Sequence, residues 1–334
     1  MDVDAEILPK NSCPKSTRIL VHVHLFYCEM WNSLRSCLEN LDKLNQTWDL
    51  YVTLVDTLSK NVAEGIIGEI KLFKAKAKIL TVANKGYDVG PFFEVLNYVN
   101  LDDYDLVVKL HSKRNVNPLT TLGTFYDVSG PKWREYLLAF INSRKVLKKT
   151  LRSFSSDPLL GMTASYNLIM PFREHGKYNI WVIEECRKLF KQLNITPTPA
   201  HNFHYVAGTM FAVRTDVVKK LKELNLDINS FNTPDRSTEK DLAHVLEYFM
   251  GWLVTSLSIT EEANSQVTAR EKKFYKIKDV FTGTLSRYFD VCSFISKHHR
   301  LVKILRFILR REYEPKQNTV HIKIFKISII SYKI

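Results

Sequence analysis

The stretch from Lys78 to Arg114 reads KILTVANKGYDVGPFFEVLNYVNLDDYDLVVKLHSKR, and it decides the fold. A short apolar run over 79–83 ends in a polar cluster with two glycines, and a second apolar run over 106–110 ends in His-Ser-Lys-Arg. A segment with helical spacing separates the two runs. Two strands joined by a crossover helix form a parallel βαβ unit, and ligands of such sheets bind in the crevice at the carboxyl ends of the strands. The pattern therefore predicts that both polar clusters face one ligand, which we expect to be anionic.

The same alternation of apolar runs and helical segments extends on both sides of this stretch. Before it, runs rich in β-branched residues at 18–27 and 50–56 are each followed by a helical pattern, at 31–44 and 61–73. Strands that alternate with helices in this way predict an α/β fold with a mostly parallel, Rossmann-type sheet flanked by helices. After the opening stretch we predict strands at 159–164 and 206–214, and helices at 131–147, 178–193, 216–224 and 239–256.

The composition is that of a globular chain in a reducing compartment. The 334 residues, of which 45% are hydrophobic, suffice for a substantial core, and no apolar run reaches the roughly 18 residues of a membrane-spanning helix. The acidic, polar residues 1–12 do not resemble a signal peptide. Five cysteines are scattered without metal-binding spacing. We therefore expect a cytoplasmic protein with idle or buried thiols.

The positive charge is concentrated in the last part of the chain. Residues 265–334 hold 16 Lys and Arg against 5 Asp and Glu, a net +11, which leaves +2 for the rest of the +13 total. We predict three parts: an N-terminal extension over 1–17, the α/β domain over 18–264, and a basic amphipathic tail over 265–334. Such a charge indicates a polyanionic surface as the partner of the tail.

Within the tail, residues 300–311 read RLVKILRFILRR and place apolar and basic side chains on opposite helical faces. This is the pattern of an interfacial membrane anchor, although a helix packed on the core or on a partner remains the alternative. Residues 320–330 alternate like a strand. Nucleic-acid binding is disfavoured because the main domain is nearly neutral and shows no recognised nucleic-acid fold.

The two polar clusters supply the candidate donor-binding residues. Glycines at a strand-to-helix turn let the backbone approach a ligand, and the helix N-terminus favours an anion. Lys and Arg supply charge for a diphosphate, and His supplies a hydrogen-bond donor. The alternatives are a tight turn with an N-cap for the first cluster and a solvated strand end for the second. The candidates are Asn84, Gly86, Asp88 and Gly90 in the first cluster, and His111, Ser112, Lys113 and Arg114 in the second.

Four segments in this order resemble the rhamnan synthesis protein F family of bacterial polysaccharide glycosyltransferases. They are NKGYDVGPFF, YDLVVKLHSKR, VAGTMFAVR and LAHVLEYFMGWLVT, and the resemblance covers roughly residues 18–258. It implies a GT-A-like fold, a nucleotide-sugar donor (most often dTDP-rhamnose) and a growing surface glycan as acceptor. The last stretch of the tail, residues 320–330, resembles short terminal modules of polysaccharide glycosyltransferases.

The resemblance also implies roles for later residues. The small-residue step at 208–211 would lie on the acceptor side, which makes His204, Gly208, Thr209 and Met210 the candidate acceptor-binding residues. His244 and Glu247 match a His-x-x-Glu pair on one helical face, and Asp241 is a second carboxylate on that face. Either carboxylate would serve as the base of an inverting transfer. Tyr248 stands where the family usually has Arg, which removes a charge contact.

Many enzymes with a GT-A fold hold a divalent metal through an Asp-x-Asp pair. Asp103 and Asp105 form such a pair, but they precede the strand at 106–110, so they should lie at the opposite edge of the sheet from the crevice. At the expected strand end the chain has cations, which can stabilise a departing diphosphate as a metal would. We therefore expect metal-independent transfer, while Mg²⁺ or Mn²⁺ remains an alternative.

Together these features predict a glycosyltransferase, specifically a rhamnosyltransferase that uses dTDP-rhamnose as co-substrate and builds a bacterial capsule, O-antigen or wall polysaccharide. We expect it on the cytoplasmic face of the membrane, bound peripherally through its tail, with a polysaccharide or lipid-linked glycan as acceptor. The alternative is a non-catalytic glycan- or nucleotide-binding domain of a polysaccharide assembly complex, which the missing Asp-x-Asp and Tyr248 allow.

Overall fold

The computed structural model divides the described residues into two compact units, one formed by residues up to 113 with 134–280, the other by 119–133 with 309–333. The predictions made for residues 1–16 and for Arg114 lie outside the described residues. The structure describes residues 17–44, 46–58, 60–113, 119–122, 126–165, 168–172, 177–234, 241–260, 272–280, 309–314, 319–324 and 327–333.

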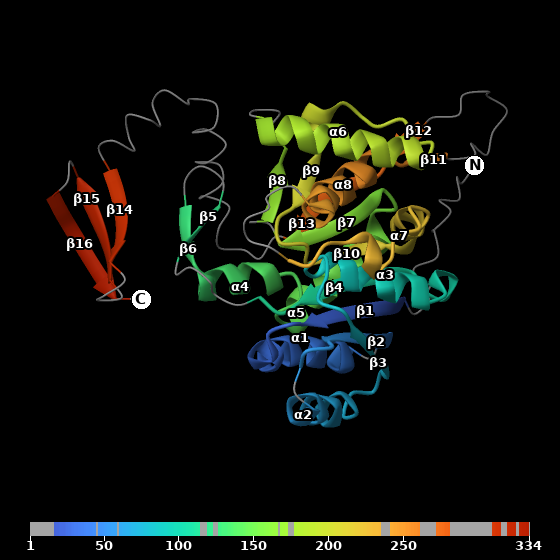
Figure 1. Ribbon diagram of the computed structural model, residues 1–334, viewed down its shortest axis with the longest axis horizontal. Helices are drawn as coiled ribbons and strands as arrows, with labels where there is room; N and C mark the ends of the chain where they lie inside the picture. The colour runs from blue at the N-terminus through green and yellow to red at the C-terminus, as the bar shows by residue number, and fades with distance from the viewer. Residues whose placement is uncertain are drawn as a thin grey trace, which may run out of the picture. The chain divides into compact units, whose positions relative to one another are not determined.

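A seven-stranded sheet with the order β13-β7-β10-β4-β1-β2-β3 forms the centre of the first unit (Figure 1). Neighbours β4, β1, β2 and β3 are parallel, β10 is antiparallel to both β4 and β7, and β13 is parallel to β7. The predicted fold class, a mostly parallel sheet flanked by helices, is confirmed. The strands are β1 (Arg18–Leu25), β2 (Thr47–Val55), β3 (Lys76–Val82), β4 (Leu106–His111), β7 (Leu160–Ser165), β10 (Phe211–Arg214) and β13 (Lys276–Val280).

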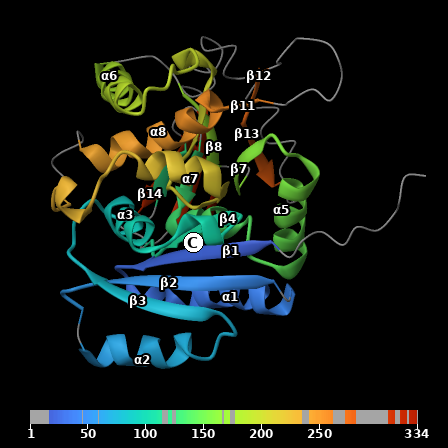
Figure 2. The same cartoon turned by 90° about the vertical axis from the view of Figure 1, so that its right-hand side faces the viewer.

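Helices lie on the sheet because their apolar stripes require a buried partner. One core cluster joins side chains of α3, α6, α7 and α8 to β1, β4, β7 and β10, whereas α1 packs against α5. Figure 2 shows α1 and α2 beside β1–β3, whereas α3 packs on β1 and β2, and α7 packs on β4 and β10. The helices are α1 (Trp31–Leu44), α2 (Lys60–Ile70), α3 (Val89–Tyr98), α4 (Gly130–Leu138), α5 (Arg144–Ser156), α6 (Lys177–Gln192), α7 (Thr215–Lys222) and α8 (Leu242–Ser256).

Two helix predictions need correction. The single helix predicted over 131–147 is two helices, because Ser143 adopts extended backbone and caps α5 by accepting a hydrogen bond from the Val146 N–H at 3.3 Å. The helix predicted over 239–256 begins at Leu242, with Asp241 as its N-cap. Both differences arise at residues whose side-chain oxygens hydrogen-bond to backbone N–H groups at a helix start.

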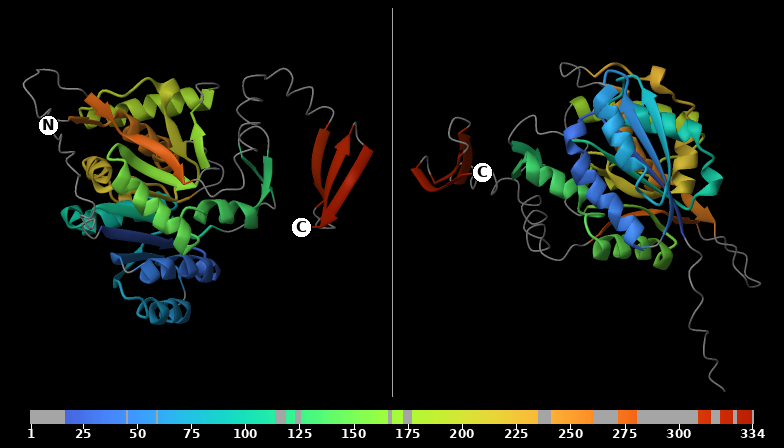
Figure 3. Two further views of the ribbon diagram at one scale, coloured as in Figure 1. Left: turned by 180° about the vertical axis from the view of Figure 1, so that it is seen from behind. Right: turned by 90° about the horizontal axis from the view of Figure 1, so that it is seen from below.

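The first unit extends beyond the predicted boundary at residue 264. β11 (Ser258–Thr260) pairs with β12 (Lys272–Phe274), and β13 then adds the edge strand beside β7. Figure 3, left, shows this pairing from behind. A second short pair, β8 (Ile169–Pro171) with β9 (His204–Val206), lies near α8.

The second unit consists, in its described part, of β-strands and the first residues of α4, 130–133. β5 (Leu119–Leu122) and β6 (Tyr126–Ser129) form an antiparallel pair, and β14 (Leu309–Glu314), β15 (Thr319–Ile324) and β16 (Ile327–Lys333) form an antiparallel sheet. The helix predicted over 300–311 is therefore wrong for its last three residues, which belong to β14, and its first nine lie outside the described residues. The strand predicted over 320–330 is confirmed as extended but is divided between β15 and β16.

None of the helices within the described ranges combines the length and the apolar character that crossing a bilayer requires.

Candidate functional site

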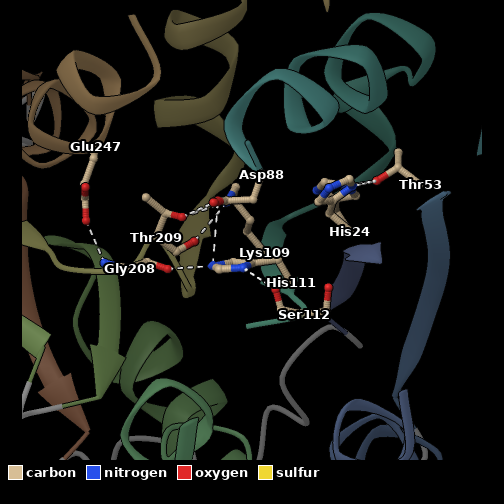
Figure 4. Close-up of polar contacts among 10 residues, drawn as sticks. His24, Thr53, Asp88, Lys109, His111, Ser112, Gly208, Thr209 and Glu247 are labelled. Atoms are coloured by element: carbon tan, nitrogen blue, oxygen red, sulfur yellow. Dashed lines mark hydrogen bonds and ion pairs between the residues drawn. The ribbon is translucent and has the colours of Figure 1, made fainter. Parts of the chain in front are cut away.

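The topology gathers polar groups at the carboxyl end of β4 (Figure 4). Because β10 runs antiparallel to β4, with Phe211 opposite Lys109, the turn that precedes β10 reaches the same sheet edge as the end of β4. Asp88, just before α3, and Glu247 of α8 approach this turn from two further elements. The structure therefore brings together the first polar cluster (residues 84–90), the end of β4, residues 208–211 and α8.

Lys109 is the centre of this network, and the sequence reasoning missed it. Its side chain is 0% exposed, and Nζ donates to Asp88 Oδ2, to the Thr209 carbonyl at 3.1 Å and to Thr209 Oγ1 at 3.0 Å. Burial lowers the pKa of Lys109, whereas Asp88 raises it. The signal was available, because a single lysine inside the apolar strand Leu-Val-Val-Lys-Leu must find a buried partner.

Asp88 stands at the N-cap position of α3 but does not cap it. Its Oδ2 instead accepts hydrogen bonds from Lys109 Nζ and Thr209 Oγ1 and lies 3.8 Å from His111 Nε2. Burial alone would raise the pKa of Asp88, but these neighbours outweigh it and lower the pKa. The N-cap alternative is therefore excluded, and the predicted contact of Asp88 with a donor competes with these internal bonds.

The first N–H groups of α3 are engaged within the turn. The N–H groups of Val89 and Gly90 both donate to the Gly86 carbonyl at 3.0 Å, and the next residue, Pro91, has none. A bound anion would have to compete with these bonds, and the expected anion site at this helix N-terminus stays a prediction.

The two glycines of this turn pack against the protein itself. Gly86 has φ +64°, and a Cβ there would lie 2.5 Å from the Phe231 ring. A Cβ at Gly90 would lie 2.5 Å from the Lys85 carbonyl oxygen. The close approach that these glycines permit is thus internal, and contacts of Gly86, Gly90 and the half-buried Asn84 with a donor stay predictions.

Of the described residues in the second cluster, Lys113 is the exposed one. Burial lowers the pKa of His111 to about 4, so the ring is neutral at pH 7 and donates from Nε2 to the Gly208 carbonyl at 2.8 Å. Ser112 is 5% exposed, and its Oγ accepts from the Phe26 and Tyr27 N–H groups at 2.9 and 2.8 Å. His111 and Ser112 therefore shape the strand end, and Lys113 alone of these three presents a charge.

The turn at Gly208 and Thr209 is left-handed, with φ +79° and +51°. The Gly208 N–H donates to Glu247 Oε1 at 2.6 Å. Thr209 and Met210 are buried, whereas His204 at the start of β9 is exposed. Of the four predicted acceptor residues, three belong to this turn and its continuation into β10, and their contact with an acceptor stays a prediction.

The three candidate residues of α8 have different environments. Asp241 Oδ1 accepts from the His244 N–H at 3.0 Å and lies 3.3 Å from its Nδ1, so this carboxylate is engaged in capping. Burial would raise the pKa of Asp241, but the hydrogen bonds from His244 lower it overall. Glu247 differs, because burial raises its pKa despite the Gly208 hydrogen bond and the charges of Lys113 and His244.

Tyr248, at the family's usual Arg position, packs in an aromatic stack. Its ring centroid is 4.4 Å from that of Tyr205 and 5.6 Å from that of Phe172. A Cβ at Gly251, three residues on, would lie 2.2 Å from the His204 carbonyl oxygen, so α8 lies directly on β9. Tyr248 thus contributes to the packing of α8.

Two further buried histidines were not anticipated. His22 and His24 of β1 are 0% and 3% exposed, and both hydrogen-bond to Thr53 Oγ1, at 2.9 and 3.0 Å. Burial lowers the pKa of His24 to about 3, and that of His22 also falls well below its usual value. Alternate residues of a strand share one face, and this spacing in Val-His-Val-His-Leu was the available signal.

No group of three His, Cys, Asp or Glu side chains suited to a metal ion occurs among the residues that the structure describes. Asp103 and Asp105 precede β4 at its amino end, where Asp105 accepts a hydrogen bond from the Arg18 N–H at 2.8 Å. The Asp-x-Asp pair therefore lies at the opposite end of β4 from His111.

Solved structures of glycosyltransferases resemble the chain only distantly. A structure of Staphylococcus aureus TarS (residues 1–349) is similar at a TM-score of 0.37 and 12% identity, over 70% of this chain and 55% of that one. Galactosyltransferase LgtC, with donor and acceptor sugar analogues, is similar at a TM-score of 0.32 and 10% identity, over 70% of each chain. Likenesses of this size say nothing of substrate.

Sequence comparison gives the family. Uncharacterized protein WxcX of Xanthomonas campestris pv. campestris (strain B100) is 26% identical over 259 residues, which are 76% of this chain and 33% of WxcX. The chain thus spans about a third of the length of the curated relatives it matches. The model of the family "Rhamnan synthesis protein F" matches residues 4–258, which include every described candidate residue. The chain belongs to the rhamnan synthesis protein F family.

Proposed function

We propose that the chain is a glycosyltransferase of polysaccharide synthesis that uses Glu247 as its base. The observation that carries the proposal is a half-buried carboxylate with a raised pKa at the carboxyl edge of the sheet, in a chain of this family. A base works best when its pKa lies near the operating pH, and burial moves Glu247 in that direction. Asp241 is the weaker candidate, because capping engages its carboxylate and its pKa is lowered.

The reaction balances as a direct displacement. The acceptor hydroxyl oxygen forms a bond to the anomeric carbon of the donor sugar, the bond from that carbon to the diphosphate oxygen breaks, and the diphosphate leaves with the electron pair. Glu247 takes the hydroxyl proton. Because the transfer is a single displacement, the configuration at the anomeric carbon is inverted. Lys113, exposed at the end of β4, would stabilise the charge on the departing diphosphate.

The finer assignment is a rhamnosyl transfer from dTDP-rhamnose to a growing bacterial capsule, O-antigen or wall polysaccharide. The name of the family supports rhamnose. The +11 charge of residues 265–334 supports attachment to an anionic membrane surface, where a lipid-linked acceptor would be met. We place the reaction on the cytoplasmic side, where nucleotide sugars are the donors.

The test is release of nucleoside diphosphate from a panel of nucleotide sugars in the presence of a lipid-linked glycan. Wild-type protein should consume one donor, and Glu247→Gln should be at least about a hundredfold slower, since that is the usual contribution of a general base. Glu184→Gln, at an exposed position of α6, should match wild type. Wild-type protein that binds a nucleoside diphosphate but consumes no donor would favour the non-catalytic binding domain instead.

A further inference from the structure

We propose that Lys109 is a positioning residue that, together with Asp88, holds the Gly208-Thr209 turn in the conformation that orients Glu247. The inference rests on the proposed function in one respect only, which is that Glu247 acts as the base. Lys109 is fully buried and makes its hydrogen bonds to Asp88 and Thr209. Apart from the attraction between its charge and that of Glu247, it therefore acts on Glu247 through the turn.

Burying the ammonium group of Lys109 is unfavourable in free energy and therefore needs a compensating role. Placing an ammonium group in a protein interior costs several kcal/mol unless it is paired and hydrogen-bonded. An apolar side chain would complete the strand Leu-Val-Val-x-Leu without that cost. Here Nζ has three acceptors for its three protons, one on Asp88 and two on Thr209. Two of the three contacts of this buried cation are with Thr209, which is distant in sequence. We therefore infer that Lys109 serves to hold Thr209 in place.

The Gly208-Thr209 turn needs external support because of its left-handed backbone. Thr209 is β-branched and has φ +51°, a conformation that is strained for a residue other than glycine. β4 fixes both carbonyl groups of the turn, since His111 donates to Gly208 O at 2.8 Å and Lys109 to Thr209 O at 3.1 Å. Asp88 fixes the Thr209 hydroxyl from the third side.

The turn directs the Gly208 N–H towards α8. With both carbonyl groups held by β4, the Gly208 N–H is directed to α8 and donates to Glu247 Oε1 at 2.6 Å. Figure 4 shows this bond beside the cluster of Asp88, Lys109, His111 and Thr209. Fixing the turn therefore fixes one oxygen of the proposed base.

Loosening the turn has a predictable electrostatic consequence. The groups that act on Glu247 are the Gly208 N–H, Lys113, Asp88 and His244, together with the charge of the buried Lys109. The hydrogen bond from Gly208 stabilises the carboxylate and lowers its pKa, whereas burial and Asp88 raise it. If this bond lengthens, the pKa of Glu247 rises, and the acidic limb of the rate profile moves to higher pH.

The experiment removes one hydroxyl, because replacing Lys109 would leave Asp88 buried and unpaired. Thr209→Ala loses the Oγ1 contacts with Lys109 and Asp88, whereas Thr209→Ser keeps them. We expect Thr209→Ala to lower kcat about tenfold with little change in the donor KM, and to move the acidic limb up by about one pH unit, as the loss of one charge-assisted hydrogen bond predicts. Thr209→Ser should restore both values.

A matched control separates positioning from stability. Thr150 is equally buried in α5 and donates to the Phe140 carbonyl at 2.7 Å, away from the turn. Thr150→Ala should lower the melting temperature but leave the acidic limb in place. The same shift in Thr150→Ala would overturn the proposal.

A second readout does not depend on turnover. Carbon-13 carboxylate titration by NMR, with the Glu247 signal assigned by its loss in Glu247→Gln, reports the protonation of Glu247 directly. The midpoint should be higher in Thr209→Ala than in Thr209→Ser. Equal midpoints would overturn the inference about Lys109, whether or not a donor is consumed. If wild-type protein consumes no donor, while the Glu247 midpoint is still higher in Thr209→Ala than in Thr209→Ser, the proposed function is refuted. The role of Lys109 in holding the turn against Glu247 is then retained.

Discussion

Acidification should destabilise this protein strongly, because β1 and β4 bury neutral histidines. His24 and His111 are each 3% exposed, and burial lowers their pKa values to about 3 and about 4, from 6.5. In the unfolded chain both take up protons below pH 6.5, while the folded protein resists protonation. Their contribution to stability is therefore fully present above pH 6.5 and is lost as the pH falls towards the folded-state pKa values.

The magnitude follows from these values. Between pH 7 and pH 5, proton uptake by the unfolded chain costs the folded state about 2 kcal/mol for each of the two histidines, so about 4 kcal/mol together. That is a large part of the 5–15 kcal/mol by which proteins are typically stable. His22 acts in the same direction, because burial also lowers its pKa. His244 acts in the opposite direction, because the hydrogen bond to Asp241 raises its pKa.

The assay is urea unfolding followed by tryptophan fluorescence at pH 7 and pH 5, with the free energy of unfolding extrapolated to water. His24→Gln keeps a side chain that can hydrogen-bond to Thr53 but cannot titrate, so its loss of stability between the two pH values should be smaller than that of wild type by about 2 kcal/mol. His201→Gln, at an exposed position, should keep the wild-type difference. If His24→Gln shows the full wild-type dependence on pH, the assignment of His24 as a buried neutral group is refuted.

Three predictions concern binding and chemistry. Lys113→Ala should weaken nucleoside-diphosphate binding about tenfold in calorimetry, because it removes an exposed cation at the end of β4, while Lys191→Ala on α6 should not; equal affinities of the two variants would exclude Lys113 from the site. Turnover should persist in excess EDTA if cations alone stabilise the leaving group, and complete loss that Mn²⁺ or Mg²⁺ reverses would refute metal independence. Replacing Arg300, Lys303 and Arg306 by Glu in the full chain should abolish sedimentation with anionic liposomes, whereas Lys188→Glu and Lys191→Glu on α6 should not; retained sedimentation of the tail variant would place membrane attachment elsewhere.

The sequence determined the sheet and the edge at which its polar residues gather. Continuous apolar runs alternating with helical patterns predicted that β1 to β4 are strands of one mostly parallel sheet, because buried strands such as β1, β2 and β4 leave that signal. Their order in the sheet, β4-β1-β2-β3, came only from the structure. The position of His111 at the end of β4 and the place of Asp103 at its other end followed from chain direction alone. These are local properties, which a stretch of about 30 residues such as a βαβ unit already specifies.

Only the tertiary structure decided how those polar groups are used. Asp88 sits where an N-cap would be expected, yet it bonds with Thr209, 121 residues away. The run Leu-Val-Val-Lys-Leu predicts a strand, and nothing in it reveals that Lys109 meets the same threonine, 100 residues away. Because these partners are brought together by the antiparallel entry of β10 beside β4, an event of sheet assembly, no local pattern could predict them. The long-range pairing gives Asp88 and Lys109 an internal partner in Thr209, and it brings the Gly208 N–H to Glu247.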